Sequence, residues 1–293
     1  MIPLNPFTAR SEAANFTLQA PFAGLAGSSH VRSIVRFQRG AAPPISATVL
    51  TKNSERLLGE VLTSLAWCDE VVVLDTGSTD RTVTIAVAYP NVSLHHLAGS
   101  FPGFGRAHQQ AVELARNDWI LSVDSDEVIS GELALEISAL PLDPESVYTI
   151  SFQNYFNGKR ITTCGWAPDR HERLFNRAVT NFCASEVHER VQTHGQVITS
   201  LRHPIRHYSY ESLEDFLRKM SSYSRLFAAQ NAGKKRSGPC KAVTRSVWAF
   251  FKSYLLQLGI LQGYEGLAIS ACKAQTVFWK YLMLYEANRR SAA

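Results

Sequence analysis

The first half of the chain alternates short apolar runs with longer segments in which apolar residues recur every three or four positions. The short runs predict strands, and the longer segments predict amphipathic helices. Alternation at these lengths is typical of right-handed crossover units, which build a mainly parallel sheet with helices on both faces. The expected strands are 45–50, 70–74, 92–96 and 119–123, and the expected helices are 56–66, 81–88 and 105–116.

The pattern changes after a predicted helix at 132–140. Short runs separated by turn residues, among them Asn157-Gly158, indicate strands at 146–155, 160–163, 173–176 and 187–193. A helical period then returns and predicts helices at 213–231, 242–261 and 266–289. The sequence therefore predicts an α/β fold, Rossmann-like, with a helical C-terminal extension. The expected division is a loosely ordered extension over 1–42, a sheet domain over 43–208 and a basic helical region over 209–293.

Acidic residues follow two of the predicted parallel strands. Asp75 and Asp80 come after the run 71–74, and Asp124 and Asp126 come after the strand at 119–123. The carboxyl ends of parallel strands meet at one edge of a sheet, so we expect these acids to share a cleft. Carboxylates at positions i and i+2 suit Mg²⁺ or Mn²⁺ held together with substrate phosphates, although an isolated Asp-x-Asp is also typical of a solvated turn. For Asp80, capping the following helix is an equally good interpretation.

The composition is that of a globular protein with a hydrophobic core, since 45% of the 293 residues are hydrophobic and 19% are charged. The sequence has neither an apolar run of about eighteen residues nor the pattern of a secretory signal, which predicts a protein that stays in the cytoplasm. The five cysteines form no Cys-x-x-Cys pair and are odd in number. We therefore expect reduced thiols rather than a disulfide framework or a zinc site.

The net charge of +5 is unevenly distributed along the chain. Residues 201–293 contain 15 Lys and Arg against 5 Asp and Glu, so the C-terminal third is strongly basic. This asymmetry indicates an anionic partner, for which a nucleic acid, a membrane surface and a phosphorylated substrate all qualify.

Three segments in a fixed order resemble a known family. TVLTKNSE begins at Thr48, VVVLDTGSTDRT begins at Val71, and LSVDSDE begins at Leu121. Together they resemble an inverting family 2 glycosyltransferase with the GT-A fold. Within that family the chain is most similar to the bacterial lipopolysaccharide-core β-glucosyltransferases, because it also has WAPDRHERLFNR, then SEVHERV, then FFKSYLLQLGILQGYEGLAIS. The resemblance covers about 45–289.

The resemblance implies a role for several of these residues. Asp124 and Asp126 would hold a divalent cation, Mg²⁺ or Mn²⁺, on the diphosphate of a UDP-sugar, with Asp126 the first choice as direct ligand. That cation would stabilise the charge that develops on the leaving nucleoside diphosphate. The residues implied to contact the nucleotide are Thr51, Asn53, Glu55 and Asp75.

An inverting transfer also needs a base that takes the proton from the acceptor hydroxyl. Glu189 matches the His-Glu pair of the family and is the preferred candidate. Glu186 is the second candidate, because alternation in an extended segment would place 186 and 188 on one face and 189 on the other.

Basic residues near these motifs are candidates for the diphosphate or for an anionic acceptor, since guanidinium groups bind phosphate in a bidentate manner. The alternative for His171 and Arg170 is that they only solvate a loop. His207 is a possible distal metal ligand, but a structural histidine is the more favoured interpretation. The basic candidates are Lys52, Arg106, Arg170, His171, Arg173 and Arg177.

The apolar and aromatic segment 247–261, with Lys241, Arg245 and Lys252 around it, is typical of a helix that lies on an anionic membrane surface, where lipid-linked acceptors are found. The alternative is that these helices pack on the sheet domain or form a homodimer interface.

Two functions other than sugar transfer are disfavoured by the sequence. A nucleotidyltransferase would carry a glycine-rich loop after its first strand, and 51–55 has no glycine. Acids at several strand ends would oppose binding of nucleic acid, so we expect no nucleic-acid partner. The resemblance favours UDP-glucose as donor and a heptose of the inner core as acceptor, while a protein or a polyprenyl-linked acceptor stays open.

Overall fold

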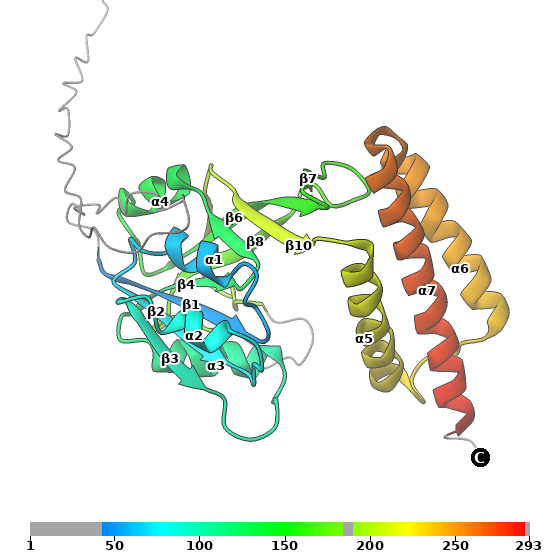
Figure 1. The fold of residues 1–293 in the computed structure, drawn as a ribbon, viewed down its shortest axis with the longest axis horizontal. Coiled ribbons are helices and arrows are strands. Elements are labelled where there is room, and N and C mark those ends of the chain that lie inside the picture. The colour runs from blue at the N-terminus through cyan, green and yellow to red at the C-terminus, as the bar shows by residue number, and fades with distance from the viewer. Residues whose placement is uncertain (1–42, 184–189, 291–293) are drawn as a thin grey trace, which may run out of the picture.

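The computed structural model describes residues 43–183 and 190–290, which form a sheet part and a helical part (Figure 1). In the sheet part, four parallel strands lie in the order β3-β2-β1-β4. Each is short and rich in β-branched or other apolar residues, and every residue of β2 is buried. These strands are β1 (Ile45–Thr51), β2 (Glu70–Asp75), β3 (Val92–His96) and β4 (Trp119–Asp124).

Three helices connect the parallel strands, as the alternating pattern predicts. They are α1 (Leu58–Ser64), α2 (Thr82–Ala86) and α3 (Phe104–Leu114). A fourth, α4 (Gly131–Ser138), begins at Ser130, whose hydroxyl accepts a hydrogen bond from the backbone N–H of Leu133. The α/β class with a mainly parallel first half is therefore confirmed.

The second half of the sheet is mixed. Beyond β4 the order continues β8-β6-β10-β5, with antiparallel contacts at β4–β8, β6–β8 and β10–β5 and a parallel contact at β6–β10. Two short strands, β7 and β9, also pair with β6. The bounds are β5 (Glu127–Ile129), β6 (Ser146–Phe156), β7 (Lys159–Arg160), β8 (Arg170–Asn176), β9 (Val197–Ser200) and β10 (Ile205–Tyr210).

Two of the predicted strands differ from the structure. The strand expected at 160–163 is limited to Lys159–Arg160, although the backbone N–H of Ile161 still donates to the carbonyl of Asn154 on β6 at 2.8 Å. Of the strand expected at 187–193, residues 187–189 lie outside the described residues, and Val191 makes only an isolated antiparallel bridge with Phe182. The strands β5, β9 and β10 were not predicted.

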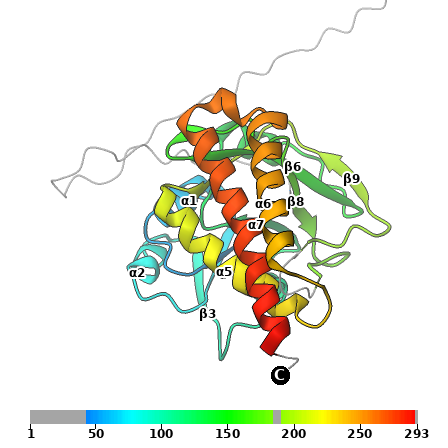
Figure 2. The same ribbon diagram turned by 90° about the vertical axis from the view of Figure 1, so that its right-hand side faces the viewer.

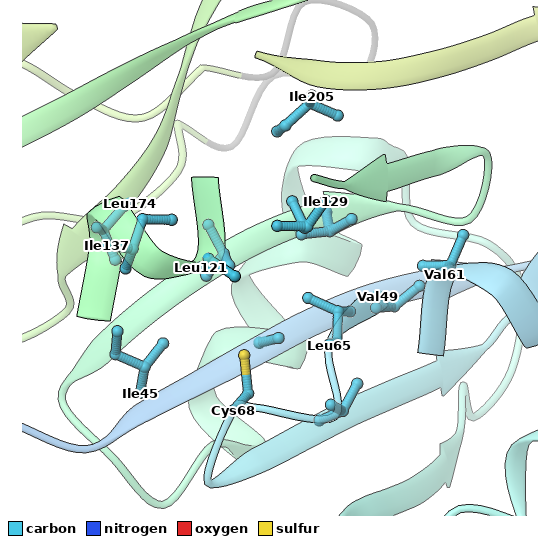
Figure 3. Close-up of a cluster of buried hydrophobic side chains, with 14 of the residues drawn as sticks. Ile45, Val49, Val61, Leu65, Cys68, Leu121, Ile129, Ile137, Leu174 and Ile205 are labelled. Atoms are coloured by element: carbon cyan, nitrogen blue, oxygen red, sulfur yellow. The ribbon is translucent and has the colours of Figure 1, made fainter. Parts of the chain in front are cut away.

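The core lies on both faces of the sheet. Val71 and Val73 belong to one cluster and Val72 to another, because successive residues of a strand point to opposite faces. On the first face, residues from β1 and β4 pack with α1 and α4, as with Val49, Leu121 and Ile137 in Figure 3. Burial on both faces explains why Val71 to Leu74 of β2 form a continuous apolar run rather than an alternating one.

The helical part consists of α5 (Leu213–Asn231), α6 (Pro239–Phe251) and α7 (Tyr264–Arg290). Figure 2 shows α6 and α7 side by side, and α5 also packs on α7. The strands β6 and β10 extend from the sheet toward these helices (Figure 1). No helix in the described residues has the length and apolar character needed to cross a membrane.

The helix predicted over 242–261 is interrupted. The α-helix ends at Phe251, and a π-helical turn (Lys252–Leu256) and a 3-10 turn (Gly259–Gln262) follow it. Leu258, between the turns, has a left-handed backbone with φ of 57°. These turns reverse the chain so that α7 runs back along α6.

Candidate active site

The acids after β2 and β4 lie at the same edge of the sheet, as the strand pattern predicts. Strand β1 separates them, since Thr51 pairs with Asp75 on one side and Leu50 pairs with Asp124 on the other. The loops after β1 and β4 also touch, because the Ser54 hydroxyl donates to Ser125 Oγ at 2.9 Å. The carboxyl edge thus gathers both acidic motifs.

Asp75 is buried, with only 2% of its surface exposed, and its carboxylate organises the loop after β2. It accepts hydrogen bonds from the Thr51 hydroxyl at 3.1 Å, from the backbone N–H groups of Gly77 and Ser78, and from the Ser78 hydroxyl. Burial by itself would raise the pKa of Asp75, but the bonds from Ser78, Gly77 and Thr51 hold it below its ordinary value. Asp75 is therefore ionised at neutral pH.

Asn53 and Glu55 join the loop after β1 to the loop after β2. The Asn53 side-chain oxygen accepts from the backbone N–H of Thr79 at 2.8 Å, and Glu55 accepts from the backbone N–H of Arg81 at 3.0 Å. Asp80 accepts from the backbone N–H groups of Glu55 and of Thr82, at the start of α2. Asp80 therefore braces the helix start, in line with the capping interpretation.

Asp124 is held by an ion pair with Arg173 on the neighbouring strand β8. The Arg173 guanidinium lies 2.8 Å from Asp124 Oδ2 and also contacts Glu127. Glu127 is fully buried and accepts the backbone N–H of Asp124 at 3.0 Å. Burial raises the pKa of Glu127, although the Arg173 charge opposes that rise. This arrangement fixes the turn that carries Asp124 and Asp126.

Asp126 lies between two cationic side chains from the later half of the chain. His207 Nε2 on β10 is 3.5 Å from Asp126 Oδ1, and Lys219 Nζ on α5 is 3.6 Å from Oδ2. Burial by itself would raise the pKa of Asp126, but His207 and Lys219 hold it below its ordinary value. The Nδ1 atom of His207 lies 2.8 Å from the side-chain oxygen of Asn154 on β6, which orients the ring.

The side chains around Asp126 supply some of the ligands that a divalent cation needs. The Asp126 carboxylate and the His207 ring face each other, and Asp124 is two residues away but bound to Arg173. Within 43–183 and 190–290, no three His, Cys, Asp or Glu side chains form a cluster suited to a metal. Mg²⁺ commonly binds one or two carboxylates and takes its other ligands from water and substrate phosphates. Asp126 and Asp124 are the two carboxylates that such a mode would use here.

The other predicted basic residues are spread over the structure. Arg106 is exposed in the first turn of α3, and Lys52 is exposed in the loop after β1. Arg170 donates to the carbonyls of Thr149 and Leu201, which ties it to the sheet. Arg177 donates to the carbonyl of Val112 at 3.0 Å and so holds the end of α3. Arg170 belongs to β8 and is bonded to backbone carbonyls, so it does not merely solvate a loop.

The two candidate bases, Glu186 and Glu189, lie outside the described residues. Their assignment stays a prediction from the sequence.

Sequence reasoning missed a network of hydrogen-bonded polar side chains next to Asp126. Asp169 Oδ1 lies 2.9 Å from His171 Nε2, its Oδ2 accepts from the Asn154 amide at 3.0 Å, and Asn154 contacts His207. Asp169 and His171 belong to the segment WAPDRHERLFNR, which carries part of the family resemblance. Nothing in the sequence around Asn154 or Lys219 marks either residue as part of a site. Only the pairing of β6 with β10 and the position of α5 bring them to the site.

The sequence matches a family model and known proteins. Residues 46–201 match the family described as glycosyl transferase family 2. An uncharacterized glycosyltransferase of Rickettsia bellii is 29% identical over 259 residues, which cover 83% of this chain and 86% of the relative. The lipopolysaccharide core biosynthesis glycosyltransferase LpsC of Rhizobium meliloti is 26% identical over 199 residues, 66% of this chain and 74% of that protein.

Solved structures are similar to parts or most of the chain. The structure of residues 1–349 of Staphylococcus aureus TarS covers 85% of this chain and 92% of that one, with 18% identity and a TM-score of 0.41. Glucosyl-3-phosphoglycerate synthase of Mycobacterium tuberculosis covers 42% of this chain and 47% of that one, with 25% identity and a TM-score of 0.31. Because the family model spans more than half of the sequence, this chain belongs to glycosyltransferase family 2.

Proposed function

We propose that this glycosyltransferase is a metal-dependent, inverting hexosyltransferase that moves glucose from UDP-glucose to a saccharide acceptor such as the heptose of the lipopolysaccharide inner core. The observation that carries the proposal is the carboxyl edge itself, where Asp75 and the Asp124–Asp126 turn flank β1. The choice of acceptor rests on the likeness to LpsC, which is named for lipopolysaccharide core biosynthesis.

The loops after β1 and β2 would bind the nucleotide. Their backbone is braced by Asn53 and Glu55, so the groups that meet a ligand are fixed before it binds. Arg173, which lies next to Asp124, adds positive charge close to the diphosphate, and Arg106 adds charge from α3. The residues proposed for the donor are Thr51, Asn53, Glu55, Asp75, Arg106, Asp124 and Arg173.

Asp126 would hold Mg²⁺ or Mn²⁺ on the diphosphate together with Asp124, and His207 is placed to join them. When bound, such a cation offsets the negative charge that develops on the leaving nucleoside diphosphate. The ionised state of Asp126, which His207 and Lys219 favour, keeps this side chain ready to accept a cation.

Glu189 is the proposed base, with Glu186 as the alternative. Either carboxylate would take the proton from the acceptor hydroxyl as its oxygen attacks the anomeric carbon from the face opposite the leaving group. That geometry inverts the configuration of the transferred sugar.

The helical part is proposed to meet an anionic membrane surface that presents a lipid-linked acceptor. Trp248, Leu256 and Leu261 are each more than half exposed, at 53%, 59% and 71%. The sequence from 216 to 264 holds nine Lys and Arg and no Asp or Glu, so charge and exposed apolar residues occur together. A homodimer that covers these residues is the alternative.

The test measures transfer from a panel of labelled UDP-sugars to truncated lipopolysaccharide, with Mg²⁺, Mn²⁺ or a chelator. We expect the Asp126→Ala and Glu189→Gln variants to fold normally and to lose at least about a hundredfold in transfer, the loss typical of removing a general base or an electrostatic stabiliser. Asp118→Ala and Glu214→Gln remove exposed acids outside the site and serve as matched controls.

Several outcomes would count against parts of the proposal. Transfer that a chelator does not affect would contradict the metal role of Asp124 and Asp126. Normal turnover of Glu189→Gln together with loss in Glu186→Gln would reassign the base. Incubation with UTP and a sugar 1-phosphate tests the alternative function: formation of a UDP-sugar with release of pyrophosphate, in place of sugar transfer, would favour a nucleotidyltransferase acting on sugar phosphates.

A further inference from the structure

A cavity of about 620 Å³ lies where the sheet part meets the three C-terminal helices. Its walls come from the ends of β6 and β10, from the loop before β8, and from α5, α6, the π-helical turn and α7. This volume is within the range of small-molecule sites, and a junction between two parts of a fold is a common place for one.

One end of the cavity is polar and reaches the proposed catalytic centre. Asn154, Asp169 and His207 line it, and they are joined to one another through Asn154 by contacts of 2.8 Å and 3.0 Å. His207 lies 3.5 Å from Asp126. A molecule that fills the cavity therefore ends beside the residue proposed to hold the cation on the donor diphosphate.

The middle of the cavity has an aromatic wall. Tyr210 stacks on Phe216 with ring centroids 4.2 Å apart, and the ring of Trp166 lies near both, at 5.9 Å from Tyr210 and 6.3 Å from Phe216. Tyr223 on α5 is an exposed part of the lining. Rigid rings of this kind bind an amphipathic ring well, because they offer a large apolar face and polar edges.

The end of the cavity formed by α6 and α7 is cationic. Lys273 is partly buried and donates to the Cys164 carbonyl, while Lys252 is exposed in the π-helical turn. Burial and the neighbouring Lys252 lower the pKa of Lys273. Among the described lining residues the only acid is Asp169, which is already bonded to His171 and Asn154. The one carboxylate of the described lining is therefore paired with residues other than the two lysines.

The break in the predicted long helix builds this end of the cavity. The π-helical turn places Lys252 and Ser253 in the wall, and Gln257 covers Gly165, whose φ is +68° and where a Cβ would lie 2.5 Å from the Gln257 amide nitrogen. π-helical turns are frequent at functional sites. The interruption therefore serves the cavity as well as the reversal of the chain.

We infer that this cavity binds the acceptor, and that the acceptor is a saccharide carrying a phosphate or carboxylate group. The anionic group lies at Lys252 and Lys273, a sugar ring lies on the aromatic wall, and the hydroxyl that accepts the transferred sugar lies at the polar end near His207. The ammonium groups of the two lysines and the anionic group of the acceptor form charge-assisted hydrogen bonds at this place, which is partly shielded from water. This inference rests on the proposed function, because the reaction in which the acceptor takes part is the proposed sugar transfer. The preference for an anionic saccharide is inferred from the residues that line the cavity.

The test uses full-length protein and a deacylated inner-core oligosaccharide, compared with the same oligosaccharide after dephosphorylation and methyl esterification of its carboxylates. Calorimetry measures binding, and steady-state kinetics measure acceptor KM and kcat. We expect the anionic form to bind about tenfold more tightly. Lys252→Met and Lys273→Met should each raise its KM about tenfold and leave kcat unchanged, whereas Lys234→Met, which removes a surface charge outside the cavity, should change neither.

Slow hydrolysis of UDP-glucose without acceptor separates the two proposals. If the wild type neither hydrolyses nor transfers sugar, the proposed function fails, while calorimetry still reports on the cavity. The acceptor inference would be overturned if the wild type bound the charged and the neutralised oligosaccharide equally well. It would also be overturned if both lysine variants still preferred the charged form as strongly as the wild type does. Lys252 is exposed, so its variant remains informative if Lys273→Met fails to fold.

Discussion

His108 shows how a single buried side chain makes the stability of this protein depend on pH. It lies on α3 with 3% of its surface exposed and stacks on Phe182, with ring centroids 4.6 Å apart. Among the described residues its Nδ1 has no hydrogen-bond partner. Burial lowers its pKa from 6.5 to about 4, because the charged ring would lose its hydration.

Between pH 6.5 and pH 4 the unfolded chain therefore binds a proton at this position that the folded protein does not bind. Stability is retained above pH 6.5 and falls as the pH drops through this window. We expect the wild type to lose about 2 kcal/mol more of its free energy of unfolding between pH 7 and pH 5 than His108→Phe loses. Urea denaturation at the two pH values measures the difference. Equal losses in the two proteins would show that folding does not lower the pKa of His108.

The sequence predicts the acidic residues of the site better than it predicts their partners. Asp75 and Asp124 were found because each follows an apolar strand, and strand ends share an edge. The contacts of Asp126 with His207 and Lys219 depend on a strand and a helix that are about 80 or 90 residues away in sequence, which no local pattern reveals. The phosphate role predicted for Arg173 did not include its buried ion pair with Glu127.

At the level of elements, the corner between α6 and α7 depends on two glycines in close contact. A Cβ on Gly266 would lie 1.8 Å from the carbonyl oxygen of Gly259, and one on Gly259 would lie 2.8 Å from Cys164 Sγ. The first clash is with backbone, which cannot rotate away as a side chain can. We expect Gly266→Ala to lower the free energy of unfolding by about 3 kcal/mol or more.

The matched control is Gly131→Ala at the start of α4, where a Cβ would meet nothing within 4 Å. We expect that variant to be unchanged or up to about 1 kcal/mol more stable, because alanine favours a helix over glycine. Thermal and urea denaturation compare both variants with the wild type. A Gly266→Ala protein as stable as the control would mean that the corner is packed more loosely than described.

This corner also explains why the helix predicted over 242–261 ends at Phe251. Apolar residues recur through the whole segment with a helical period, so the pattern gives no reason to stop at Phe251. The chain turns because Leu258 adopts a left-handed backbone and Gly259 permits close contact with α7. The strands β5, β9 and β10 were missed for another reason: runs of three to six residues carry too little alternation to distinguish them from loops.

The whole molecule combines a sheet part that holds the acids with a helical part that is basic and exposes large apolar residues. A surface with both properties favours an anionic bilayer over neutral lipid. We expect the protein to float with vesicles that contain anionic lipid at low salt and to be released at high salt, because salt screens the lysine and arginine charges. The paired change Trp248→Glu and Leu261→Glu should abolish flotation.

The control for flotation is Leu135→Glu, an equally drastic change at an exposed apolar residue of the sheet part. It should leave flotation intact. Absence of any binding to anionic vesicles at low salt would remove the membrane proposal. A dimer in sedimentation that the paired change dissociates would support the homodimer in its place.

The stereochemistry of the transferred sugar tests the proposed reaction most directly. The full-length protein is incubated with UDP-glucose, whose sugar is α-linked, and with truncated lipopolysaccharide and Mn²⁺, and the anomeric configuration of the product is read by NMR. We expect a β-linked glucose, formed only when Asp126 is intact and no chelator is present. An α-linked product, or transfer that survives both Asp126→Ala and the chelator, would contradict an inverting, metal-dependent transfer at this site.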